Sequence, residues 1–376
     1  MEHYLDNSAT TRVCREAAEA ALKAMTESYG NPSSTHTKGR EAKRLLDESR
    51  KQVASALGCT PQELVFTSCG SESDNWAILK GAELMRRRGK HVISSMAEHD
   101  AVLKSLEELE RQGYEVTRLR PDRTGAIPAQ AVLDALRSDT ILVSLMLVNN
   151  ETGAVTDIAA IAKAMKKAAS QALLHTDAVQ AFMKLPFTAK SLGADMISIS
   201  GHKIHAPKGI GALYIRNGLK LKPYILGGSQ ESGRRAGTEA MSQIAAFGAA
   251  CAVAKAGFEE NARHMAALRS LAIEELSRDL PELVVIGGGA PHILSISLPG
   301  WRSEVLMNYM EEREIYVSKS SACKKGGRSH VLEAMGLEPK VIDGAIRIGL
   351  SRFNGEEDIY ALRDGLRDAR ERLAHV

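Results

Sequence analysis

Residues 195–203 read Asp195-Met196-Ile197-Ser198-Ile199-Ser200-Gly201-His202-Lys203. The first six have the apolar, β-branched character of a buried strand. Glycine, histidine and lysine follow, so the strand ends in a polar turn that presents Lys203. The earlier run 172–176 has the same character and ends at Asp177. A lysine and a carboxylate are therefore expected at the ends of two strands of one sheet.

Around these two strands, short β-rich runs alternate with amphipathic helical patterns from about residue 62 to 216. Strands are predicted over 63–67, 91–95, 114–119, 141–148, 172–176, 195–200 and 211–215, and helices over 101–112, 128–137 and 158–169. This spacing predicts an α/β fold with a mostly parallel seven-stranded sheet covered by helices on both faces. In such sheets ligands bind beyond the carboxyl ends of the strands, where Asp177 and Lys203 are expected.

The remainder of the chain predicts a smaller α+β domain. A long helical stretch covers about 240–280. It is followed by predicted strands at 293–298, 315–317 and 345–349 and by predicted helices at 304–312, 330–335 and 356–373. We expect a large domain over residues 14–255 and a small domain built from residues 1–13 and 256–376.

The composition indicates which partners are not expected. The 49 Lys and Arg residues against 46 Asp and Glu leave a net charge of +3, which is too small to indicate direct nucleic-acid binding. The longest apolar run, 141–148, is too short to cross a membrane. Residues 1–6 lack the character of a secretory signal, and the five cysteines are scattered without metal-ligand spacing. We therefore expect a cytoplasmic protein with free thiols and no metal site.

Lys203 and Asp177 together are what pyridoxal phosphate (PLP) requires of a protein. A lysine amine forms a Schiff base with this cofactor, and a carboxylate keeps its ring nitrogen protonated so that the ring can withdraw electrons. A lysine after a strand is otherwise a solvated surface charge. Here Ser200 and His202 add groups able to bind a phosphate, and Gly201 permits close backbone approach. This context favours a cofactor site.

Two further segments could complete this site. Residues 66–75 read as a strand, a turn of small residues and a helix start, so free amides at Gly70 and Ser71 could cradle the phosphate. An ordinary helix N-cap at Ser71 is the alternative. Asn149 and Asn150 follow the most apolar strand, where buried amides need a polar partner such as a ligand. A plain turn is the alternative there.

Three residues outside these segments are also candidates. His99 could stack on a cofactor ring and relay protons, or it could simply begin a helix. Arg347, on a predicted strand of the small domain, could hold a substrate carboxylate with both nitrogens, and an internal salt bridge would serve it equally well. Cys323 lies among serines, glycines and cations in residues 317–328, which favours a reactive thiolate. That basic loop could instead be a solvated face or a landing site for an acidic or RNA-bound partner. The remaining cysteines, Cys14, Cys59, Cys69 and Cys251, are interpreted as small packing residues.

Taken in order along the chain, these residues resemble the cysteine desulfurases, which belong to the class V (fold-type I) PLP-dependent aminotransferase superfamily. The resemblance covers nearly the whole chain. The segments that carry it are 4–11, 30–34, 67–75, 98–99, 148–151, 175–180, 200–203, 235–238, 321–323 and the strand around Arg347. Each segment alone is weak, but all of them in this order are specific.

The resemblance implies a role for each matching residue. Lys203 would carry PLP, Asp177 would pair with its ring nitrogen, Gln180 would contact its ring hydroxyl, and His99 would stack on the ring and take part in catalysis. The phosphate would be held by Gly70, Ser71, Ser200 and His202, with Thr238 contributed by the second subunit of a homodimer. Asn150 would contact the cofactor and, together with Arg347, would orient the substrate carboxylate.

The same resemblance implies the reaction. L-cysteine would be converted to L-alanine, with its sulfur passed to Cys323 as a persulfide. The sulfur would then go to an acceptor protein, in iron-sulfur cluster assembly, tRNA thiolation or thiamine synthesis. A selenocysteine lyase would keep the same site, whereas a transaminase would have no use for the Cys323 thiol. A non-catalytic subunit would be expected to lack Lys203, Asp177 or Cys323, and all three are present.

Overall fold

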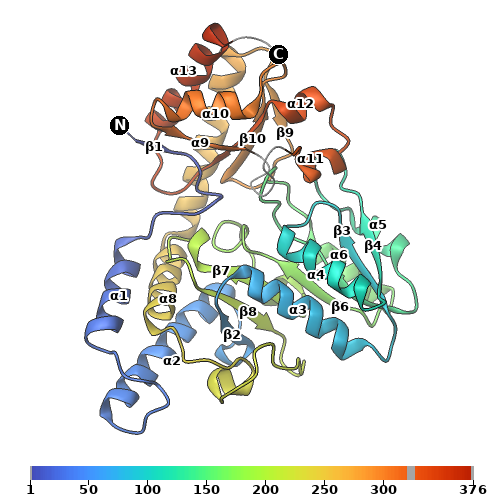
Figure 1. Ribbon diagram of the computed structural model, residues 1–376, viewed down its shortest axis with the longest axis vertical. Helices are drawn as coiled ribbons and strands as arrows, with labels where there is room; N and C mark the ends of the chain where they lie inside the picture. The colour runs from blue at the N-terminus through green and yellow to red at the C-terminus, as the bar shows by residue number, and fades with distance from the viewer. Residues whose placement is uncertain (1, 320–326, 374–376) are drawn as a thin grey trace.

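A seven-stranded sheet forms the centre of the larger part of the molecule (Figure 1). The structure, a computed structural model, describes residues 2–319 and 327–373. The strands lie in the order β2 (Leu64–Thr67), β8 (Gly211–Ile215), β7 (Met196–Ser200), β6 (Leu173–Asp177), β5 (Thr140–Ser144), β3 (His91–Ser95) and β4 (Glu115–Leu119). Only β8 runs antiparallel to its neighbours. The predicted mostly parallel sheet of seven strands is thus confirmed.

Two apolar layers cover this sheet, one on each face, because apolar side chains point to both faces from its strands. Met196 packs in one layer with α3 (Gly70–Met85) and α4 (Asp100–Arg111). Its neighbour Ile197 packs in the other layer with α1 (Arg15–Thr26), α2 (Thr37–Leu57), α6 (Ile158–Lys167) and α8 (Met241–Ala256). Successive strand side chains point to opposite faces, so both faces must be covered when every strand residue is buried. Two shorter helices, α5 (Ala129–Ala135) and α7 (Ala189–Leu192), complete the connections.

The second part of the molecule has its own sheet and core. Its four antiparallel strands lie in the order β12 (Ser318–Lys319), β13 (Ala345–Gly349), β10 (Ile293–Ser297) and β9 (Val284–Ile286). Against them pack α9 (Phe258–Asp279), α10 (Ser303–Glu311) and α13 (Glu356–Arg372). Near the N-terminus, β1 (His3–Tyr4) pairs with β11 (Ile315–Tyr316), so Leu5 joins this core, while Cys14 joins the core of the large sheet. The exact domain boundaries remain a prediction.

Two predicted elements differ from the observed ones by more than two residues. The strand predicted over 141–148 ends at Ser144, and residues 145–148 continue as buried, irregular backbone toward the cavity described below. The long helix predicted over 240–280 is two helices, α8 and α9, which meet at Gly257 with a bend of 75°. Among the described residues no single helix is long and apolar enough to cross a membrane, although this bent pair reaches that length and composition together.

Candidate active site

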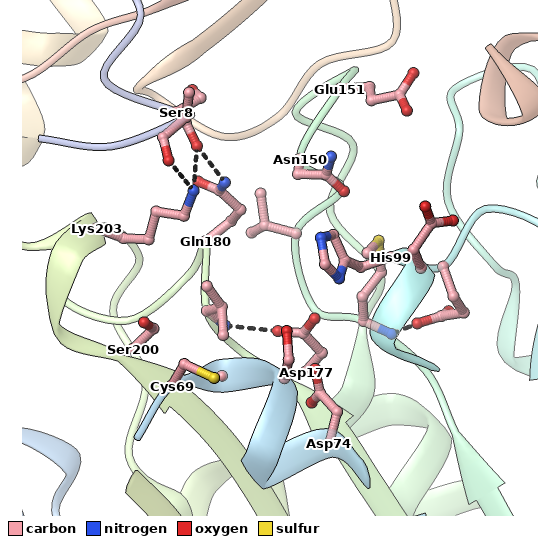
Figure 2. A pocket seen from close by; sticks show the side chains of 18 of the residues that line it. Ser8, Cys69, Asp74, His99, Asn150, Glu151, Asp177, Gln180, Ser200 and Lys203 are labelled. Carbon is pink, nitrogen blue, oxygen red and sulfur yellow. Dashed lines mark hydrogen bonds between the residues drawn. The ribbon is translucent and has the colours of Figure 1, made fainter. Parts of the chain in front are cut away.

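A cavity of about 340 Å³ lies beyond the carboxyl ends of β6 and β7, between the two parts of the molecule (Figure 2). Its wall includes nearly all the residues expected at a PLP site: Gly70, Ser71, His99, Asn150, Asp177, Gln180, Ser200, His202, Lys203 and Arg347. These residues are spread over almost the whole sequence. Their convergence follows from the parallel sheet, which brings the ends of its strands to one edge.

Lys203 follows β7 in a short 3-10 turn, Gly201–Lys203, and its side chain extends toward Ser8 (Figure 2). The amine donates hydrogen bonds to the carbonyl oxygens of Ser8 and Ala9, both at 2.6 Å. Burial, reinforced by the nearby Arg347 charge, lowers the pKa of Lys203 to about 7. A substantial fraction of this amine is therefore neutral near neutral pH, as a nucleophile toward an aldehyde must be.

Asp177, the last residue of β6, is buried on the opposite side of the cavity and accepts a 2.8 Å hydrogen bond from the Val179 amide. Burial raises the pKa of its carboxyl, while the neighbouring His99 and Lys203 act in the opposite direction. A protonated ring nitrogen beside it would supply the positive charge that a buried carboxylate requires. Gln180 donates to the Ser8 carbonyl oxygen at 2.9 Å, which fixes its side chain at the same wall.

The phosphate end of the site fits the cofactor. Helix α3 begins at Gly70 and Ser71, so its free backbone amides face the cavity. A Cβ at Gly70 would lie 2.7 Å from Cγ2 of Val179, so glycine permits this close packing. The buried Ser200 hydroxyl has no hydrogen-bond partner within the described part of the chain. A phosphate would satisfy these donors together.

His202 completes this end of the site. Burial lowers the pKa of its imidazole to about 4. A neutral ring can donate from only one nitrogen, and Nδ1 lies 3.3 Å from the Thr10 hydroxyl. It can therefore serve as a neutral hydrogen-bond partner for a phosphate.

His99 begins a helix, as one interpretation of its position expected, and it also lies at the cavity, where its stacking on a cofactor ring stays a prediction. It is the N-cap residue of α4, with Nδ1 accepting a 3.1 Å hydrogen bond from the Ala101 amide. It also lines the cavity (Figure 2). Because Nδ1 is the acceptor, a neutral ring carries its proton on Nε2. The helix cap thus fixes the tautomer of the ring.

Of the two asparagines after β5, Asn149 forms a turn and Asn150 lies at the cavity. Asn149 forms the turn, since its Oδ1 accepts from the amides of Glu151 and Thr152, both at 2.9 Å. Its Nδ2 donates to the Ala97 carbonyl oxygen at 2.9 Å, which ties this loop to the loop before His99. Asn150 lines the cavity.

Arg347 forms the internal salt bridge considered for it, and its binding of a substrate carboxylate stays a prediction. It is only 2% exposed, and Nη2 pairs with Asp6 at 3.1 Å while Nη1 donates to the Asn150 carbonyl oxygen at 2.8 Å. Its Nε has no partner within residues 2–319 and 327–373. The side chain lines the cavity, so the internal salt bridge holds the guanidinium where an anion could approach it.

Two predicted site residues are not among the described residues of this cavity wall. Cys323 lies outside the described residues. Thr238 is exposed and lines a separate pocket with Arg235 and Phe66. Its assignment to a second subunit's phosphate site stays a prediction.

Sequence reasoning missed several residues of the cavity wall. These are Ser8, Ala9, Cys69, Asp74, Glu98, Glu151, Arg328 and His330. The interpretation of Cys69 as a packing residue is wrong, because the turn before α3 exposes it to the cavity. Glu98 and Glu151 adjoin His99 and Asn150 in sequence, and that adjacency was the available signal.

The comparisons with known proteins agree with this geometry. The family model for aminotransferase class-V matches residues 3–362. Cysteine desulfurase IscS of Methanosarcina thermophila is 42% identical over 361 residues, which cover 95% of this chain and 89% of that protein. A solved NifS-like protein superposes with a TM-score of 0.94 at 36% identity, covering 99% of this chain and 100% of the other. SspA, solved in complex with cysteine, gives a TM-score of 0.81 at 31% identity, covering 94% and 100%.

The fold and the site therefore define a fold-type I enzyme that depends on PLP. The chain belongs to the class-V aminotransferase family and, within it, to the cysteine desulfurases.

Proposed function

We propose that the chain converts free L-cysteine to L-alanine and passes the sulfur to Cys323 as a persulfide. The observation that carries the proposal is the convergence of Lys203, Asp177 and Arg347 on one cavity. These side chains provide, respectively, an amine for covalent attachment of the cofactor, a carboxylate for its ring nitrogen, and a cation for the substrate carboxylate. The similar SspA holds cysteine, which supports the choice of substrate.

The chain's own residues divide the work. Arg347 and Asn150 would bind the carboxylate of cysteine and orient its Cα. Lys203 would accept and return a proton at Nζ, for which a pKa of about 7 is well suited. The Nε2 proton of His99 would be available for exchange with the substrate thiol. When bound, PLP supplies the electron sink that permits carbanion character next to the C–S bond.

Sulfur transfer then requires a thiolate. Cys323 would form an S–S bond with the substrate sulfur while the C–S bond breaks. The bonding electron pair stays on the substrate carbon, which takes up a proton to give L-alanine. The cations Lys324, Lys325 and Arg328, close in sequence, favour the thiolate form of Cys323.

The proposal includes a homodimer, a sulfur-acceptor protein and a cytoplasmic location. Thr238 would complete the phosphate site of the partner subunit, which accounts for its position outside the cavity of its own chain.

The relatives named IscS favour an acceptor in iron-sulfur cluster assembly. Transfer to a tRNA-thiolation or thiamine-synthesis protein is the alternative. Selenocysteine lyase activity is the second candidate function, because it would use the same cavity residues.

The test is product analysis with the purified, PLP-loaded protein. L-cysteine should yield L-alanine and reducible sulfur in equal amounts. Pyruvate and ammonia would instead indicate a β-lyase. A parallel reaction with L-selenocysteine distinguishes the second candidate, which requires that substrate to be converted much faster than L-cysteine.

A further inference from the structure

The start of α11 (His330–Ala334) is bonded to the cavity wall rather than only to its own part of the molecule. Ser329, the N-cap residue of α11, is six residues after Cys323 in the sequence. Its hydroxyl donates to Oε2 of Glu151 and accepts from the Leu332 amide at 3.1 Å. Ser329 is 3% exposed and Glu151 is 4% exposed, so water does not compete with this pair.

A second hydrogen bond joins the same two regions. Nε2 of His330 lies 3.1 Å from the backbone carbonyl oxygen of Glu98. Glu98 precedes His99, and Glu151 follows Asn150. Consecutive residues of the α11 N-terminus thus contact the neighbours of two residues that line the cavity.

Hydrogen bonds of Asn149 join the two loops that line the cavity. Asn149 accepts from the Glu151 amide and donates to the Ala97 carbonyl oxygen, so it links the loop at 97–99 to the loop at 149–151. Glu151 has its backbone held by Asn149 and its side chain by Ser329. Any displacement of the α11 N-terminus relative to the site must therefore break buried hydrogen bonds.

A contribution to folding stability does not explain why a buried carboxyl occupies position 151. A buried carboxyl with a single side-chain hydrogen bond is costly, and an uncharged residue of similar size would be cheaper. Burial raises the pKa of the Glu151 carboxyl to about 7, although the Ser329 hydrogen bond and the Arg347 charge act to lower it. The hydrogen bond to Ser329 therefore explains a carboxyl at position 151 better than a contribution to stability does.

We propose that the Glu151–Ser329 hydrogen bond fixes the end of the segment that carries Cys323 against the substrate site. In this role Glu151 and Ser329 are positioning residues for sulfur transfer, not catalytic residues. The inference depends on the proposed function, because it assumes that Cys323 receives the sulfur. It predicts that the bond governs the rate of transfer and leaves cofactor binding unchanged.

The experiment separates the contact from the helix cap. Ser329→Asp keeps an N-cap acceptor for α11 but cannot donate to Glu151 and places a like charge beside it. Ser329→Thr keeps both the cap and the donor. Thr188→Ala is the matched control: it removes another N-cap, whose Oγ1 accepts a 3.0 Å hydrogen bond from the Ser191 amide. Neither Thr188 nor Ser191 lines the cavity.

Each PLP-loaded variant is mixed once with L-cysteine. The rate of persulfide formation on Cys323 is measured by mass spectrometry, and the PLP absorbance and cysteine affinity are recorded alongside. We expect Ser329→Asp and Glu151→Ala to slow transfer about tenfold or more. The PLP absorbance and cysteine affinity should stay near wild type. Ser329→Thr should restore the rate, and Thr188→Ala should leave it unchanged.

A double variant, Glu151→Ala with Ser329→Ala, adds a test of coupling. Its loss should be no greater than that of Ser329→Ala alone, because Ser329→Ala already removes both the hydrogen bond to Glu151 and the one from the Leu332 amide. Wild-type transfer rates in Ser329→Asp and Glu151→Ala would overturn the inference. Loss of PLP binding in them would overturn it too, since it would indicate a purely structural contact. If the wild-type protein forms no persulfide on Cys323, the proposed function itself fails first.

Discussion

At the residue scale, the N-terminal segment holds two side chains of the site: the Ser8 and Ala9 carbonyl oxygens accept from Lys203, and Asp6 pairs with Arg347. Asp177, Lys203 and Arg347 are visible in the sequence as site residues. The carbonyl oxygens of Ser8 and Ala9 that orient Lys203 are not, because backbone acceptors leave no signature in residue types. Asp6, the ion-pair partner of Arg347, lies at the other end of the chain, and only the tertiary fold brings them together.

The lowered pKa of Lys203 makes capture of PLP dependent on pH. Burial favours the neutral amine, so the reactive form dominates above about pH 7. We expect the rate of PLP capture by the apoenzyme to rise through pH 7 and then level off, as measured by stopped-flow absorbance, with Lys203→Ala as the blank. A rate that keeps rising toward the ordinary lysine pKa of about 10.4 would contradict the account.

Arg347 should govern affinity for the substrate. Arg347→Lys keeps the charge but loses the planar fork, so we expect the KM for L-cysteine to rise roughly tenfold or more. Asp6→Asn is the control, since it removes the ion pair and leaves the guanidinium. Asp6→Asn should raise the KM for L-cysteine less than Arg347→Lys does. Equal KM values in wild type and Arg347→Lys would exclude the guanidinium from substrate binding.

At the element scale, the ends of strands and helices carry the function, and these were the least predictable parts. The chain leaves β5 at Ser144, and residues 145–148, though as apolar as a strand, run on to Asn149 and the cavity. Hydrophobicity alone cannot distinguish buried irregular backbone from a strand. The split at Gly257 was not predicted because alanine-rich, helix-forming sequence continues on both sides of that glycine.

The start of α3 provides an element-scale prediction. A methyl group at residue 70 would meet Cγ2 of Val179 at 2.7 Å, so Gly70→Ala must move the helix start or Val179. We expect weaker PLP binding in Gly70→Ala, measured by equilibrium titration of the apoenzyme. The double variant with Val179→Ala should recover much of the affinity, because it removes the contacting methyl. An unaffected single variant would show that the close packing does not matter for the cofactor.

At the scale of the whole molecule, the alternating strands and helices were enough to predict the seven-stranded sheet and the smaller α+β part. Ten predicted site residues meet in one cavity, nine of them at the edge where the parallel strands of the large sheet end and Arg347 from the second sheet. The sequence analysis placed residues 1–13 with the small domain, and Leu5 does pack in the second core, whereas the contacts of Ser8 and Ala9 with Lys203 were not expected. Contacts between segments this far apart in sequence have no local pattern.

The dimer can be tested with mixed subunits. If Thr238 serves the partner's phosphate site, Thr238→Ala should weaken PLP binding in the other subunit. A mixed dimer of Lys203→Ala and Thr238→Ala chains would then contain one site with both residues intact. We expect PLP titration of this mixed dimer to reveal one tight site per dimer. If Thr238 acts within its own chain, no site in the mixed dimer would be intact.

The central claim is that sulfur from cysteine passes through Cys323, and one labelling measurement tests it most directly. The PLP-loaded protein would be given sulfur-labelled L-cysteine for one turnover, then alkylated, digested and mapped by mass spectrometry. The account predicts labelled persulfide on the peptide containing Cys323, and none in Cys323→Ser, whose PLP absorbance should be unchanged. Label on Cys69, the thiol that lines the cavity, or undiminished sulfide release by Cys323→Ser would contradict it.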